Sequence, residues 1–109
     1  MILQIDTIET KNITVGLKDP KSKMVTKLVT NQKIGTQVLL PQIIKVLNKR
    51  KMSLKDVTRI EVNPGPGSFT GTRVGVAVAN ALGFALSVPV NGKKGKIVLP
   101  IYEKSKFDL

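Results

Sequence analysis

The chain of 109 residues contains no cysteine and no histidine. Without cysteine it can form no disulfide bond and offers no thiolate for catalysis or metal binding. Without histidine it lacks the commonest metal ligand and the commonest general base near neutral pH. Both absences weigh against metal-dependent catalysis and against triad catalysis, so the composition favours a protein that is not an enzyme.

Aromatic and acidic residues are also scarce. There is one tyrosine and no tryptophan, and seven Asp and Glu stand against eighteen Lys and Arg, which gives a formal net charge of +11. Such an excess indicates an acidic partner, for which tRNA or another nucleic acid is the obvious candidate. Because most of the excess is lysine and few aromatic rings can stack on bases, a lysine-rich surface that binds no RNA is the alternative.

The chain also has no apolar run that predicts a membrane span. The most apolar stretch, Val74–Val90, is shorter than the roughly 20 residues that a span requires, and Asn80 interrupts it. Met1 leads directly into apolar residues without the basic region that opens a signal peptide. The sequence therefore predicts a cytoplasmic protein, with a length typical of one domain.

Alternation of apolar and polar residues predicts a sheet in the first part of the chain. Two runs show this period after a short, mostly apolar run, and the polar turn Lys18–Lys23 between the two indicates an antiparallel meander. A fourth strand is expected after a short turn, Ser53–Asp56, that resembles a capping box. The four expected strands are Ile2–Asp6, Ile13–Leu17, Met24–Thr30 and Thr58–Val62.

A long helix is expected from Thr36 to about Arg50, where apolar residues follow helical spacing. Pro41 indicates that this helix either starts near Leu40 or bends there. A second segment, Val74–Leu86, alternates larger and smaller residues, which alone is typical of a strand. Its length and its four alanines favour a helix instead, beginning near Thr70.

Read as a helix, the second segment carries a stripe of small residues four positions apart. Such a stripe allows either the chain's own sheet or a partner's helix to approach closely. If a partner packs there, leucine at position 75 or 79 would abolish the complex and leave the fold mostly intact. The stripe consists of Gly71, Gly75, Ala79 and Gly83.

The segment Asn63–Gly75 has the most specific pattern in the chain. Two glycines alternate with two prolines after a predicted strand, and Ser68 and Thr70 are placed to cap the following helix. The pattern lacks the Gly-Lys of a Walker loop, and its third glycine comes one place late for a dinucleotide motif. A phosphate at the helix N-terminus is one interpretation, and a structural turn that sets the helix direction is the other. The candidate phosphate-binding residues are Asp6, Thr7, Gly65, Gly67 and Ser68.

The last part of the chain is expected to hold a fifth, edge strand at Val88–Val90, where Pro89 ends the apolar run. Gly92–Lys96 is expected to be a flexible basic connector. Ile97–Tyr102 is compatible with one more strand, and Glu103–Leu109 with a frayed tail. This divides the chain into a domain over 1–92 and a connector with tail over 93–109.

Three segments together resemble a known family. Ile2–Thr7 is similar to its opening strand, Leu39–Ile43 to the start of its first helix, and Gly65–Gly75 to its signature. The family is TsaB, also called YeaZ, the non-catalytic partner in bacterial tRNA threonylcarbamoyladenosine synthesis. The resemblance covers about residues 1–92. It implies an α/β fold: a single actin-like ATPase or ribonuclease-H-like domain, with a mixed five-stranded sheet and two long helices.

The resemblance also implies a paralogous partner, TsaD, which holds the ATP and metal and performs the transfer, so no cofactor is expected on this chain. Further partners would be a TsaE-like ATPase, tRNA bound through the complex, and a second copy of the chain when the partner is absent. In the family the two long helices form a bundle with the partner. The residues expected to bind it are Leu39, Ile43, Phe69, Thr70, Gly71, Arg73, Gly75, Ala79 and Gly83.

The chain departs from the family pattern at two places. Ile34–Thr36 replaces a His-Ser-like helix start, and most of a second domain is missing, with Leu99–Tyr102 similar to the family's terminal segment. The expectation is therefore a short family member that serves as a non-catalytic scaffold. The residues leave two alternatives open, a small nucleotide-binding protein that uses Asp6 and the turn, and a basic tRNA-binding module.

Overall fold

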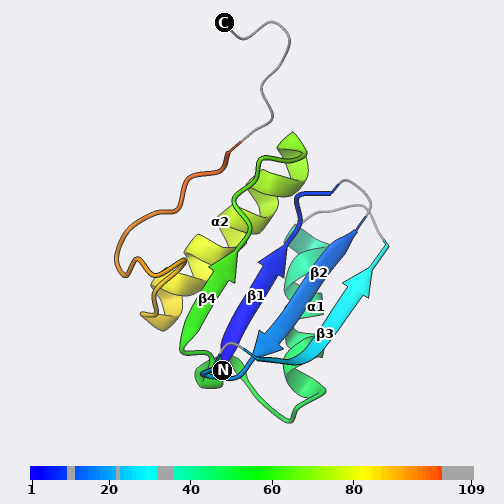
Figure 1. The fold of residues 1–109 in the computed structure, drawn as a ribbon, viewed down its shortest axis with the longest axis vertical. Coiled ribbons are helices and arrows are strands. Elements are labelled where there is room, and N and C mark those ends of the chain that lie inside the picture. Colours follow the sequence, from blue (N-terminus) through cyan, green and yellow to red (C-terminus); the bar gives the residue numbers. More distant parts are fainter. Residues whose placement is uncertain (10–11, 22, 32–35, 102–109) are drawn as a thin grey trace, which may run out of the picture.

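In the computed structural model, which describes residues 1–9, 12–21, 23–31 and 36–101, one mixed sheet carries both long helices on the same face (Figure 1). Helices α1 (Thr36–Asn48) and α2 (Phe69–Leu86) pack side by side under it. The strands are β1 (Ile2–Asp6), β2 (Ile13–Lys18), β3 (Met24–Thr30) and β4 (Arg59–Val62), with a short 3-10 helix at Leu54–Asp56. The predicted α/β class is confirmed.

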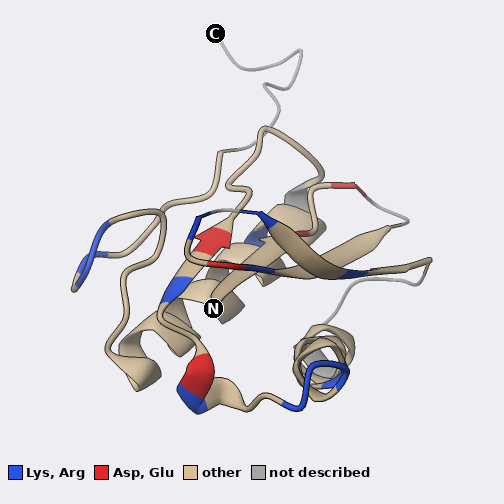
Figure 2. Ribbon diagram, turned by 60° about the horizontal axis from the view of Figure 1, so that its bottom comes forward, with Lys and Arg blue, Asp and Glu red and all other residues tan. Residues whose placement is uncertain are grey.

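The strands lie in the order β3-β2-β1-β4. The first three form an antiparallel meander, as the sequence predicts, and β4 runs parallel to β1. The parallel pairing follows from topology, because α1 returns the chain between β3 and β4 and lets β4 start from the same end of the sheet as β1. Figure 2 shows from a second side that both helices lie on one side of the sheet.

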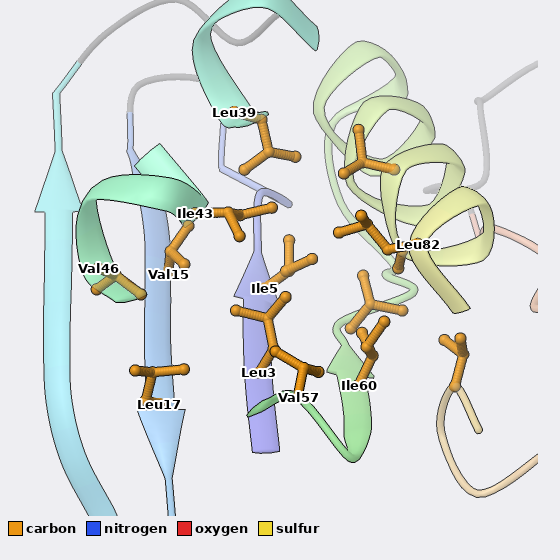
Figure 3. Packing of buried hydrophobic residues seen from close by; sticks show 14 of the residues in the cluster. Leu3, Ile5, Val15, Leu17, Leu39, Ile43, Val46, Val57, Ile60 and Leu82 are labelled. Atoms are coloured by element: carbon orange, nitrogen blue, oxygen red, sulfur yellow. The ribbon is translucent and has the colours of Figure 1, made fainter. Parts of the chain in front are cut away.

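The core fills the space between the sheet and the helices (Figure 3). Alternate residues of the strands point inward, so one face of each central strand is apolar and buried. Helix α1 covers β2 and β3, and α2 covers β4 and β1. Burying one such aliphatic side chain contributes about 1.5–3 kcal/mol. The strand residues include Leu3, Ile5, Val15, Leu17 and Ile60, and the helix residues include Leu39, Ile43, Val46 and Leu82.

The expected start of α1 at Thr36 is confirmed, and the alternative start near Leu40 is wrong. The helix begins at Thr36, continues through Pro41 and ends at Asn48, two residues before the expected end. Proline is accommodated on the exposed side of the helix, where a carbonyl that has lost its partner can bond water. In the short turn that follows, the Asp56 carboxylate accepts a bond from the Ser53 amide at 2.9 Å, as the capping-box pattern indicates.

The helical interpretation of the second apolar segment is confirmed. Helix α2 begins at Phe69, and Ser68 is its N-cap, with its hydroxyl accepting a bond from the Gly71 amide at 3.1 Å. Thr70, the other expected cap, is instead an exposed residue of the first turn. The helix ends at Leu86, where Ser87 adopts a left-handed conformation with φ of 55°. Neither helix in the described part of the chain is long and apolar enough to cross a bilayer.

The fifth strand expected at Val88–Val90 is reduced to a single parallel bridge between Val90 and Ile60, so the sheet of the described residues has four strands. Two features stop it from growing. Pro89 has no amide hydrogen to donate, and Asn91 and Gly92 both have positive φ, which turns the chain back after Val90.

The segment from Gly92 onward differs from the expected free connector. Lys93 pairs with Val90 across a tight turn, and Ile97–Ile101 then runs without regular structure. The extra strand expected at Ile97–Tyr102 is therefore absent from its described residues. Tyr102, the tail Glu103–Leu109 and the departure at Ile34–Gly35 lie outside the described residues.

Candidate functional site

The proline-glycine turn between β4 and α2 is held by the end of β1. The Asp6 carboxylate accepts bonds from the side-chain amide of Asn63 at 3.2 Å and from the Ile8 amide at 3.4 Å. The Asn63 side-chain oxygen in turn accepts from the Gly65 amide at 3.1 Å. The Ser68 amide donates to the Ile8 carbonyl at 2.8 Å. These bonds join the turn to the residues that follow β1.

Thr7 makes the closest connection between β1 and α2. Its side chain is fully buried, and its hydroxyl donates to the Gly71 carbonyl at 2.6 Å. A Cβ atom at Gly71 would overlap the Thr7 carbonyl, and one at Gly75 would overlap the Thr7 hydroxyl. Glycine is required at both positions because the helix lies directly against the backbone and side chain of Thr7.

The five candidate phosphate-binding residues lie around the turn, but they are largely in contact with other residues of the chain. The Ser68 hydroxyl and the Gly71 amide bond one another, and the Thr7 hydroxyl is directed at a carbonyl. A Cβ atom at Gly67 would meet Ile8, and one at Gly65 would overlap the carbonyl of Ile101, which crosses the turn. The Asp6 carboxylate at the turn opposes a second anion. The geometry therefore favours the structural interpretation of the turn.

Most residues expected to touch a partner lie inside the domain. Leu39, Ile43 and Ala79 have no exposed surface, and the three glycines of the stripe are buried. Gly83 lies against Val90 just as Gly71 and Gly75 lie against Thr7. At these six positions the small and apolar residues pack within the chain, where they let α2 approach its own sheet, and contact with a partner there stays a prediction. Of the other three, Thr70 and Arg73 are exposed, and the side chain of Phe69 lies outside the described part.

An exposed apolar surface on α1 was not singled out from the sequence. Leu40 and Ile44 are 44% and 39% exposed, one turn apart. With Pro41, Lys45 and Asn48 they line an open groove of about 450 Å³. The sequence does hold a signal for it. Its apolar residues extend around α1 further than one sheet can cover, so some of them must face outward. We call these five residues the α1 groove.

Acidic side chains are few and dispersed in the structure. Glu61 lies on the open face of the sheet, where it pairs with Lys18 at 2.7 Å and Arg59 at 3.7 Å. Among the described residues, no three acidic side chains gather where they could hold a metal ion. The Asp6 carboxylate lies at the turn, where it is bonded to Asn63 and Ile8.

Comparisons with known proteins place this fold. Residues 31–92 match the family model described as "TsaD: tRNA N6-adenosine threonylcarbamoyltransferase". The tRNA threonylcarbamoyladenosine biosynthesis protein TsaB of Buchnera aphidicola (subspecies Schizaphis graminum) is 37% identical over 94 residues. The chain belongs to the TsaB family. The TsaB protein of Bacillus subtilis is 32% identical over 91 residues. YeaZ from Pseudomonas aeruginosa superimposes with a TM-score of 0.71 at 30% identity.

The chain matches less than half of each of these longer relatives. The alignment covers 84% of this chain but 43% of the Buchnera relative, and 82% of the chain but 40% of the Bacillus relative. The superposition on YeaZ likewise covers 82% of the chain and 41% of that protein. The chain thus spans about two fifths of the length of its TsaB relatives.

Proposed function

We propose that this protein takes part in tRNA threonylcarbamoyladenosine biosynthesis as a non-catalytic subunit that binds a TsaD-like partner. Family membership supports the pathway, and the match to the TsaD model supports descent from a common domain. On this view the sheet order β3-β2-β1-β4 is the ribonuclease-H-like half of an actin-like ATPase fold.

The observation that carries the proposal is the α1 groove. Exposed apolar side chains that adjoin one another in a patch mark interaction surfaces more often than isolated ones do. Leu40 and Ile44 are exposed on α1, and the neighbouring helix α2 exposes Thr70, Arg73 and Ala77. A partner helix packed here would bury the apolar side chains of α1 and meet the small Ala77 of α2. We therefore assign partner binding to the exposed residues of α1 and α2, whereas the glycine stripe of α2 packs inward against Thr7 and Val90.

The test is co-purification with the TsaD-like protein of the same organism. Leu40→Glu combined with Ile44→Glu places two charges in the groove and leaves the core intact, so complex formation should fall at least about tenfold. Val29→Glu is the matched control, because Val29 is a 55% exposed aliphatic residue on β3. The proposal is wrong if the double variant is retained by the partner as well as the control is.

The proposed scaffold and the nucleotide-binding alternative differ in whether the isolated chain binds ATP. The groups of the turn are satisfied within the chain, so isothermal titration with ATP and magnesium should give no heat of tight binding. A site with a dissociation constant of about 10 μM or lower would favour the alternative.

A further inference from the structure

A basic loop lies beside the C-terminal part of α2. From Val62 to Ile101 the chain contains Arg73, Lys93, Lys94 and Lys96 but no Asp or Glu. Figure 2 shows these lysines on a loop that projects from the body of the domain, away from the acidic residues. We call residues 92–96 the lysine loop.

Two asparagines anchor this loop at its two ends. At the start, the Asn91 side chain accepts a bond from the Val62 amide at 2.8 Å and donates to the Val62 carbonyl at 2.9 Å. At the end, the Asn80 side chain makes the same pair of bonds with Val98, at 3.0 and 2.9 Å. A backbone held by paired bonds on both sides loses less entropy when a ligand binds than a free connector does.

A cavity of about 360 Å³ lies between the lysine loop and α2. Its floor is formed by α2 at Asn80 and Gly83, and its rim carries Phe84 and the three lysines. The Phe84 ring is 89% exposed, the highest value among the large apolar residues of the described chain. An exposed ring beside several cations is the combination that holds a nucleic acid strand, because the ring stacks on a base while the cations meet phosphates.

We infer that the lysine loop, Phe84 and the cavity between them form an RNA-binding site that holds an unpaired stretch of tRNA. The choice of tRNA as the RNA rests on the proposed function, whereas the site itself is argued from charge, the exposed ring and the anchored loop. A base stacks on Phe84 at the cavity mouth, and Lys93, Lys94 and Lys96 contact the backbone phosphates on either side. The site lies on α2 far along the helix from the proline-glycine turn.

The first test measures binding of the isolated full-length chain to an unmodified tRNA transcript by fluorescence anisotropy at several salt concentrations. Lys93→Glu, Lys94→Glu and Lys96→Glu together should weaken binding at least about tenfold and lower the salt slope by about two. The control is Lys21→Glu, Lys23→Glu and Lys27→Glu, which changes the net charge equally at exposed positions of the β2–β3 region. Equal losses in both triple variants would overturn the inference.

The second test separates stacking from charge. Phe84→Leu keeps an apolar side chain but removes the ring, and it should weaken tRNA binding about fivefold while heparin binding stays unchanged. Poly-glutamate serves as the probe for an acidic protein segment. The site is for RNA if Phe84→Leu affects tRNA alone. If poly-glutamate binds as tightly as tRNA and the leucine variant binds tRNA normally, the inference is wrong and an acidic protein is the occupant.

This outcome can be told apart from failure of the proposed function. The triple lysine variant leaves the α1 groove untouched, so it should co-purify with the TsaD-like partner at the normal level. Loss of tRNA binding with normal partner binding supports the site, and loss of both would show that the lysine loop is part of the partner interface instead.

Discussion

The two ends of α2 are built differently. At its beginning the helix lies so close to β1 that Gly71 and Gly75 touch Thr7 and leave no space for a side chain. At its other end Gly83 lies as closely against Val90, but beyond that contact a cavity with an exposed Phe84 remains between the helix and the lysine loop. The first end carries the recognisable sequence motif, and the second carries the open surface. A distinctive sequence motif can thus be required for a close backbone contact, while the surface available to a ligand lies in a segment with a less distinctive sequence.

The largest loss of stability is expected where the N-terminal part of α2 packs against Thr7. Gly75→Leu would force a side chain into Thr7 and should lower the free energy of unfolding by about 4 kcal/mol. Urea denaturation measures this, with Ala81→Leu as the control at an exposed position of the same helix. The sequence-based expectation was that leucine at position 75 leaves the fold mostly intact. If the two variants have similar free energies of unfolding, close packing of Gly75 against Thr7 is not required for stability.

A smaller loss of stability is expected where Asn91 anchors the lysine loop beside the C-terminal part of α2. Asn91→Ala removes two bonds to Val62 and places alanine at φ of 50°, so stability should fall by about 2 kcal/mol. Hydrogen exchange of the Val62 amide, measured together with urea denaturation, would locate the loss. Asn91→Gly is the matched variant, because it removes the bonds without the conformational strain. If both variants keep the Val62 amide protected, the side chain does not anchor the loop.

The smallest loss of stability is expected from removing the hydrogen bond between Thr7 and Gly71. Thr7→Val keeps the shape of the buried side chain but removes the hydroxyl that donates to Gly71, which should cost about 1 kcal/mol. The transition in urea should keep its slope, since the packing of α2 is unchanged. Thr58→Val is the control, because its hydroxyl makes a longer, exposed bond at 3.3 Å. Equal stability of both variants would assign the contact to packing alone.

Much of the fold could be predicted from local pattern. The second and third strands of the meander follow from alternation, and the Ser68 cap follows from its place before an apolar run. The helical state of α2 was predicted against an alternating pattern because alanine content and length outweighed it. The fifth strand could not be predicted correctly, since Val88–Val90 has strand-like residues while the left-handed turn at Asn91–Gly92 ends the pairing.

The candidate site was predicted less well, because burial depends on which side of a helix faces the sheet. Leu39 and Leu40 are neighbours of the same type, yet Leu39 is fully buried and Leu40 is 44% exposed. Nothing in their identity separates them, since the distinction comes from where β2 and β3 lie under α1. For the same reason the roles of Asn80 and Asn91 appear only in the folded chain, where each meets a distant backbone segment.

The amino-acid sequence alone was enough to predict the family, the α/β class and a sharp turn followed by a capped helix. These properties depend on residues close together in the chain, so local conformational preference is enough to specify them. Only the tertiary structure decided that the glycine stripe faces inward, that the α1 groove faces outward and that the lysine loop is anchored. Each of these depends on contacts between segments far apart in the sequence, where a small approach distance or a pair of hydrogen bonds selects one face over the other.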